Sequence, residues 1–302
     1  MPSWQFHLIK TVFQLLRIFT HPAGVLDVEK NRQRTEALAT FFKTNFELTC
    51  RQVDANRVPA EWIAIPKTSK EKVILYLHGG SYNCGSIKSH RSLAANIANS
   101  SKTSALIIDY RLAPENPFPA AVEDTITAYR WLLESQFSPK QIIVAGDSSG
   151  GGLALALLIS LRDANEPLPV AAVCLSPWTD LTCTGESWET NAGKDMMLDP
   201  ISTKEAARLY LGGADHRTPL ASPLHADLKG LPPVLIQVGS DEAILSDATC
   251  LAKKAQAAGV DATLEVWEGM QHEWHFAANF LPEGRRAIDR IGRFAEDHFG
   301  KM

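Results

Sequence analysis

The chain has 302 residues, of which 45% are hydrophobic and 21% charged, so we expect one large folded domain and not a disordered or fibrous protein. Its formal net charge is -4 and its basic residues are scattered, which argues against a phosphate-binding surface and predicts no nucleic-acid partner.

The N-terminal stretch 4–19 is apolar at helical spacing, which predicts an amphipathic helix packed on the rest of the chain. His7, Lys10 and Arg17 interrupt it, and no small-residue cleavage site follows, so we expect neither a signal peptide nor stable membrane insertion. The five cysteines lack the paired spacings of a zinc site or a disulfide framework. Free thiols and a cytoplasmic location are therefore expected.

From about residue 72, short apolar runs rich in β-branched residues alternate with helical patterns, which predicts a mostly parallel central sheet flanked by helices. Residues 47–65 precede this alternation and predict an antiparallel pair. The expected strands are Val73–Leu77, Ala105–Asp109, Ile142–Ala145, Val170–Leu175, Val234–Val238 and Thr263–Trp267. The expected helices are residues 89–99, 119–135, 149–162, 246–258 and 284–298.

Two segments fall outside this alternation, residues 1–45 and 180–220, and the second is too long for a simple crossover. We expect them to form a helical cap subdomain over the ends of the strands, where ligands bind in open α/β sheets. The α/β core then comprises residues 46–179 and 221–302.

The sharpest local motif is Gly146-Asp147-Ser148-Ser149-Gly150, which lies between an apolar strand and an apolar helix. This is the Gly-x-Ser-x-Gly pattern in its strand-turn-helix context, where glycines permit the sharp turn that exposes a serine hydroxyl. Ser148 is therefore the candidate nucleophile of an α/β-hydrolase fold. On this segment alone, a phosphate loop or a plain tight turn is the alternative, although the lysine of a phosphate loop is missing.

A second glycine-rich loop, His78-Gly79-Gly80-Ser81, follows the first expected parallel strand. Its backbone can approach a ligand closely because glycine has no side chain. We expect the amides of Gly79, Gly80 and Ser149 to form an oxyanion hole, which stabilises the tetrahedral intermediate of acyl transfer. His78 is expected to order this loop.

The chain resembles the hormone-sensitive-lipase-like carboxylesterases, also called bacterial family IV or the Gly-Asp-x-Gly family. The resemblance covers about residues 70–300 and rests on the His78 loop, on residues 110–115 and 118–121, on the Ser148 turn, and on two late loops. It implies an α/β-hydrolase fold with a helical cap, no metal or cofactor, and hydrolysis of short- to medium-chain acyl esters. Homodimers are common among such proteins, which leaves a homodimer open for this chain. Two departures from the family motifs, Ser81 and Ser149, remove no backbone donor.

Two histidines compete for the general base, which in this fold follows the acid late in the chain. His272 matches the family's catalytic position after the last expected strand, whereas His275 stands where a helix is expected to begin. We predict that His272 is the base and that His275 is structural.

The acid is expected in the loop that follows residues 234–238. Asp241 matches the position of the family's catalytic aspartate and is predicted to orient His272. Glu242 remains as the alternative. Asp247 is explained by the first turn of the next helix, where a carboxylate favours exposed amides.

Together these residues predict a serine carboxylesterase that cleaves a small-molecule ester through a Ser148-His272-Asp241 triad and an acyl-enzyme intermediate. A lactone or amide hydrolase with the same triad is the alternative. A non-catalytic small-molecule receptor on the same fold is the rival from another class, although such receptors lose a triad member. The residues expected to line the acyl pocket are Trp178, Met196, Met197 and residues 1–20.

Overall fold

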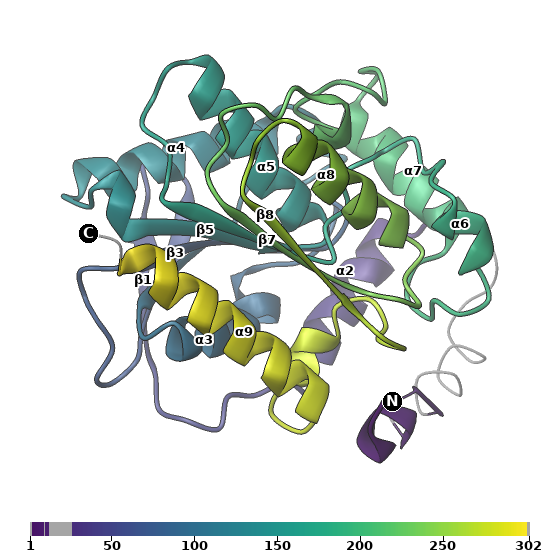
Figure 1. The fold of residues 1–302 in the computed structure, drawn as a ribbon, viewed down its shortest axis with the longest axis horizontal. Helices are drawn as coiled ribbons and strands as arrows, with labels where there is room; N and C mark the ends of the chain where they lie inside the picture. The colour runs from purple at the N-terminus through teal and green to yellow at the C-terminus, as the bar shows by residue number, and fades with distance from the viewer. Residues whose placement is uncertain (1, 9, 12–25, 301–302) are drawn as a thin grey trace.

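The computed structural model describes residues 2–8, 10–11 and 26–300, and within them a central sheet of eight strands organises the fold (Figure 1). The strand order is β1-β2-β4-β3-β5-β6-β7-β8. The pairs β1/β2 and β2/β4 are antiparallel, and every later pair in this order is parallel. The strands are β1 (Thr49–Asp54), β2 (Pro59–Ala64), β3 (Val73–Leu77), β4 (Ser104–Ile108), β5 (Ile142–Asp147), β6 (Ala171–Leu175), β7 (Val234–Gly239) and β8 (Ala262–Trp267).

The central strands are apolar because both of their faces are covered. Every residue of β3, β4, β5, β6 and β7 is buried, as a parallel sheet between two helical layers requires. The mostly parallel sheet predicted from the sequence is confirmed, including the antiparallel pair that precedes it. Strand ends differ from the expected ones by at most two residues.

Helices form a layer on each face of the sheet (Figure 1). Apolar residues of α4, α5 and α8 pack in one core cluster, while those of α3 and α9 pack in a second cluster on the opposite face. The helices are α2 (Val28–Ala39), α3 (Ile87–Ser100), α4 (Ala120–Glu134), α5 (Ser149–Asp163), α6 (Ser187–Thr190), α7 (Pro200–Leu211), α8 (Leu245–Ala257) and α9 (Pro282–Phe299). Short 3-10 turns occur at Pro139–Gln141, Pro223–His225 and Trp274–Ala277.

The two segments that fall outside the alternation of strands and helices, residues 1–45 and 180–220, contain α2, α6 and α7. Helix α7 begins after Asp199, whose carboxylate accepts the amides of Ile201 and Ser202, and it ends at Gly212 in the left-handed region (φ 57°). Helix α2 begins after Asp27, whose side chain accepts the amide of Lys30. Local capping thus defines both helices independently of the sheet.

Both helices contact the loop that follows β3. Arg32 of α2 donates from Nε to the carbonyl of Asn83 (2.9 Å) and from Nη2 to the carbonyl of Ala113 (3.1 Å). Tyr210 of α7 stacks on Tyr82, with ring centroids 3.7 Å apart. Two segments far apart in the sequence therefore pack on the same loop.

The N-terminal segment contacts the last part of the chain. Residues 4–8 are helical, and Phe6 is buried in a small apolar cluster with Met270 and Trp274. The helix expected over residues 4–19 lies mostly outside the described residues. Within the part of the chain that the structure describes, no helix is both long enough and apolar enough to cross a membrane.

Helix α5 approaches β3 so closely that Gly150 has no room for a side chain. A Cβ atom on Gly150 would lie 2.0 Å from the carbonyl oxygen of Leu77 and 2.6 Å from that of His78. We expect Gly150→Ala to lower the free energy of unfolding by about 1–3 kcal/mol or more, because the backbone must shift. Urea denaturation measures this change.

Gly193→Ala is the matched control, since no atom lies within 4 Å of the added Cβ. We expect its stability to stay within about 1 kcal/mol of the wild type. Equal stability of the two variants would contradict the close packing of α5 on β3.

Candidate active site

Ser148 occupies the sharp turn between β5 and α5. Its backbone is in the left-handed region (φ 51°, ψ -119°), which is rare for a residue with a side chain. Its amide donates to the carbonyl of Leu175 (2.8 Å), and its own carbonyl accepts the amide of Trp178 (2.9 Å). The hydroxyl is therefore fixed at the carboxyl end of the parallel strands and at the N-terminus of a helix, where negative charge is stabilised.

His272 lies in the loop after β8 and contacts this serine. Its Nε2 atom is 3.1 Å from Ser148 Oγ, and its ring is almost fully buried. The structure thus brings together the two residues that the sequence predicts as nucleophile and base. His275, the competing histidine, instead contacts Gln237 through Nε2 (3.0 Å), and burial lowers its pKa to about 3.

The acidic partner of His272 is Glu242 and not Asp241. His272 Nδ1 is 2.9 Å from Glu242 Oε2, whose other oxygen accepts from Ser176 Oγ (2.8 Å) and from the amide of Gly239. Asp241 does not contact the imidazole; its side chain is 18% exposed and is contacted by Lys10 Nζ (3.3 Å) and by Gln271. The prediction that Asp241 orients His272 is therefore wrong. The two acids are neighbours, and the turn after β7 directs only the second one inward.

Burial and the neighbouring charges shift the pKa values of His272 and Glu242 in opposite directions. Burial disfavours the imidazolium, whereas a negative charge on Glu273, when that group is ionised, and the hydrogen bond and charge of Glu242 raise the pKa of His272 above its ordinary value. Burial raises the pKa of Glu242, while the hydrogen bond with His272 opposes that increase. A fully buried carboxylate beside one ring nitrogen favours a proton on the imidazole.

The loop after β3 supplies backbone amides beside Ser148, but Gly79 is not among the free ones. The Gly79 amide donates to Asp147 Oδ2 (3.0 Å), so the prediction that it faces an oxyanion is wrong. The amides of Gly80 and Ser81 have no acceptor among the described residues. Ser149 is the first residue of α5, where amides lack an intrahelical partner.

His78 organises this loop from inside. Its Nδ1 atom is 2.8 Å from the carbonyl of Gly79, and its ring stacks on Tyr110 at 4.2 Å. Burial lowers the pKa of His78 to about 3, so the ring is neutral at ordinary pH. This agrees with the ordering role expected for it.

The three predicted pocket residues lie in different environments. Trp178 is buried in the main core cluster, and its amide donates to the carbonyl of Ser148 (2.9 Å). Met196 is nearly buried. Its amide donates to Oε1 of Gln271 (2.9 Å), the residue that precedes His272. Met197 is 40% exposed. Their contact with a substrate stays a prediction.

A cluster of buried acids adjoins the serine turn. Ligand atoms of His90, Asp147 and Glu273 lie within 4.8 Å of one another, a grouping that can hold a metal ion in other proteins. Here the hydroxyl of Tyr76 and the amide of Gly79 both donate to Asp147. The arrangement is that of a buried hydrogen-bond network. The cysteines, predicted to be free, form no disulfide.

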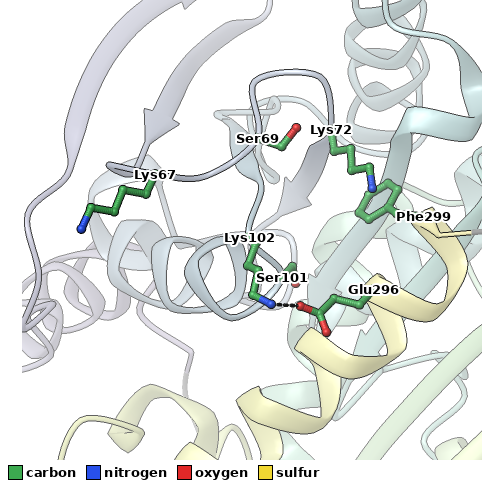
Figure 2. Close-up of a pocket in the computed structure, with 7 residues that line it drawn as sticks. All are labelled: Lys67, Ser69, Lys72, Ser101, Lys102, Glu296 and Phe299. Carbon is green, nitrogen blue, oxygen red and sulfur yellow. Dashed lines mark ion pairs between the residues drawn. The ribbon is translucent and has the colours of Figure 1, made fainter.

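A separate surface pocket lies away from Ser148. Figure 2 shows it with Lys102 paired to Glu296 (2.5 Å) and with Lys72 near the ring of Phe299. Lys72 and Lys102 precede β3 and β4, so this pocket is at the amino ends of the parallel strands. Ser148 follows the carboxyl end of β5, at the opposite edge of the sheet.

Comparisons with known proteins agree with this fold. A family model described as the α/β-hydrolase fold matches residues 74–276. An acetyl-hydrolase of Streptomyces hygroscopicus is 48% identical over 249 residues, covering 82% of this chain and 83% of that protein. An esterase of Acinetobacter venetianus is 32% identical and covers 97% of this chain and 96% of that protein.

Solved structures give the same result. The crystal structure of an esterase from the bacterial hormone-sensitive lipase family is 46% identical, covers 96% of this chain and 98% of that chain, and superposes with a TM-score of 0.92. The fold, the family model and these relatives agree. The chain therefore belongs to the α/β-hydrolase fold family, as a carboxylic ester hydrolase of the hormone-sensitive-lipase-like group.

Proposed function

We propose that this protein is a serine carboxylesterase that cleaves short- to medium-chain acyl esters through Ser148, His272 and Glu242. The observation that carries the proposal is the continuous chain of contacts from Ser148 Oγ to His272 Nε2 (3.1 Å) and from His272 Nδ1 to Glu242 Oε2 (2.9 Å). Nucleophile, base and acid are thus in hydrogen-bonding order.

The first step is attack of Ser148 Oγ on the ester carbonyl while His272 Nε2 takes the serine proton. The negative charge that forms on the carbonyl oxygen is stabilised by the amides of Gly80 and Ser81, which have no acceptor among the described residues, and by the amide of Ser149 at the start of α5. Return of the proton to the alkoxide leaving group releases the alcohol and leaves an acyl-serine. Water then repeats the sequence and releases the acid.

Glu242 fixes the tautomer that this mechanism needs. Its buried carboxylate accepts from Nδ1 of His272, so Nε2 is the nitrogen that faces the serine. Only a neutral imidazole can accept the serine proton, so activity falls as the pH drops and His272 becomes protonated. The carboxylate stabilises the imidazolium that forms during attack.

We further propose that the described part of residues 1–45 forms, with residues 180–220, a cap that bounds the acyl pocket. Helices α2 and α7 support this role because both contact the loop that carries Gly80 and Ser81. Met196 supports it as well, since its amide is tied to Gln271 beside the base.

Hydrolysis of p-nitrophenyl esters from acetate to palmitate tests the function directly. We expect wild-type turnover to be highest for the short and medium chains. Ser148→Ala should lower kcat/KM by at least about 10³-fold, because no other hydroxyl occupies the nucleophile position. A folded Ser148→Ala variant with wild-type activity would contradict the assignment of the nucleophile.

The two neighbouring acids give a matched pair of variants. We expect Glu242→Gln to lower kcat by about 10³–10⁴-fold, because the amide no longer stabilises the imidazolium or selects its tautomer. Asp241→Asn should change kcat by less than about tenfold, since Asp241 contacts Lys10 and Gln271 and not the imidazole.

Nuclear magnetic resonance titration of the His272 ring gives an independent readout for the same pair. Removing the carboxylate in Glu242→Gln should lower the pKa of His272 by about 1–3 units. A larger loss of activity and a larger pKa change in Asp241→Asn would restore Asp241 as the acid.

The docking of α2 provides a test of the cap. Arg32→Met removes the donors to Asn83 and Ala113 and the ion pair with Glu115, and should loosen α2 over the pocket. We expect kcat/KM for decanoate relative to butyrate to rise several-fold. Lys30→Met on the same helix is the control, because its side chain is 70% exposed. An unchanged chain-length profile in Arg32→Met would refute this role of α2.

A further inference from the structure

Glu273 follows the proposed base directly, and its side chain turns back toward the serine. The Glu273 backbone is in the left-handed region (φ 57°), and its side chain is only 12% exposed. Its Oε1 atom lies 3.7 Å from Nε2 of His272, the same nitrogen that faces Ser148 Oγ. Glu273 therefore stands beside the atom that exchanges the catalytic proton.

Glu273 also lies near Asp147, the residue before the proposed nucleophile, with carboxyl oxygens of the two within 4.8 Å of each other. Asp147 is fully buried and accepts from the hydroxyl of Tyr76 and from the amide of Gly79 (3.0 Å). Nε2 of His90 lies 3.2 Å from Asp147 Oδ2. All three neighbours are donors, so Asp147 binds them as a carboxylate.

The protonation of this cluster follows from its charges. Burial opposes ionisation of Asp147, but attraction to His90 and the hydrogen bonds it accepts hold its pKa below the ordinary range. Burial of His90 is likewise outweighed by Asp147, so the pKa of His90 is raised. Asp147 and His90 thus form a buried ion pair, and the carboxylate has no proton to give.

Carboxyl oxygens of Glu273 and Asp147 lie within 4.8 Å of each other in the buried cluster. Two carboxyl groups can hydrogen-bond only when one of them carries a proton, because two carboxylates have only acceptors. Asp147 is paired with His90 as a carboxylate, so the proton falls to Glu273. Burial, followed by the charge of Asp147, raises the pKa of Glu273 to about 8.

We propose that Glu273 is a positioning residue that holds a proton at neutral pH and donates it to Asp147. This inference rests on the proposed function, since it concerns how His272 acts as a base. A neutral Glu273 adds no negative charge beside Nε2, so His272 can release its proton between turnovers. The bond to Asp147 also secures the carboxylate that anchors the Gly79 amide.

Loss of this proton at alkaline pH should harm the reaction in two ways. Two neighbouring carboxylates would repel each other, and a negative charge would stand 3.7 Å from His272 Nε2, where it favours the imidazolium over the neutral base. The titratable groups that face Glu273 are Asp147, His272, His90, Tyr76 and Cys84.

The pH profile of kcat/KM for a short p-nitrophenyl ester tests the proposal. Glu273→Gln keeps a donor for Asp147 but cannot ionise. We expect the wild type to lose activity on an alkaline limb near pH 8, matching the raised pKa of Glu273, and the variant to lack that limb. Its acid limb should stay at the wild-type position, because Glu273 is already neutral there.

Two outcomes of this experiment would overturn the proposal. An identical alkaline limb in both proteins would assign that limb to another group. A downward shift of the acid limb by about 1–3 units in Glu273→Gln would show that Glu273 is charged while His272 titrates. Glu268→Gln, an exposed site on the same loop, is the control and should keep both limbs.

Infrared spectroscopy supplies a readout that needs no turnover, so it separates failure of this inference from failure of the esterase assignment. We expect a carboxylic-acid carbonyl band in wild-type protein at neutral pH that disappears on alkaline titration. Burial also raises the pKa of Asp247 to about 7, so both spectra are taken in an Asp247→Asn background, where the band should persist with Glu273 in place and be absent in Glu273→Gln. If Glu273→Gln does not fold, Glu273→Met replaces it. A wild-type spectrum without a band that titrates above neutral pH would refute the proposal.

Discussion

The left-handed backbone of Ser148 is the constraint on which the rest of the site depends. Such a conformation costs a residue with a side chain about 1–3 kcal/mol, so surrounding contacts must hold it. The hydrogen bond to Leu175 and the tight packing of Gly150 on Leu77 provide them. Because Leu77 leads directly into the loop with Gly80, the same packing fixes the nucleophile against the oxyanion donors. Preorganised donors of this kind stabilise a transition state without later rearrangement.

The sequence predicts the architecture well because buried parallel strands leave a clear pattern. Short runs that are apolar on both faces, such as β3 and β5, cannot be confused with the half-exposed β8. The proposed nucleophile and base also follow from chain order, since Ser148 comes directly after β5 and His272 lies in the loop after β8. The placement of α2 and α7 was not predictable in the same way. Their contacts with Tyr82 and Asn83 join distant parts of the chain, and no local pattern encodes them.

The acid could not be identified from residue types, because Asp241 and Glu242 are adjacent and both can orient a histidine. Their side chains leave the turn in different directions, and the choice depends on partners from elsewhere. Glu242 is held inward by Ser176, which follows β6 and has its own left-handed backbone (φ 43°). Gly79 shows the same limit, since its amide donates to Asp147 at the end of β5, the strand that pairs with β3. The direction of a side chain within a turn thus depends on tertiary contacts with residues from other parts of the chain.

Charge balance explains how so many acids can surround one base. A histidine beside two buried carboxylates would hold its proton too strongly to act as a general base, because each negative charge favours the imidazolium. The structure separates the acids by function: Glu242 contacts the imidazole at Nδ1, whereas Asp147 is neutralised by His90. The remaining acid, Glu273, lies near both His272 Nε2 and the Asp147 carboxylate. Whether it is charged decides whether His272 works as a base or stays an ion-pair partner. In the proposed mechanism, the protonation of a residue outside the proposed triad thus sets the chemistry that the triad can perform.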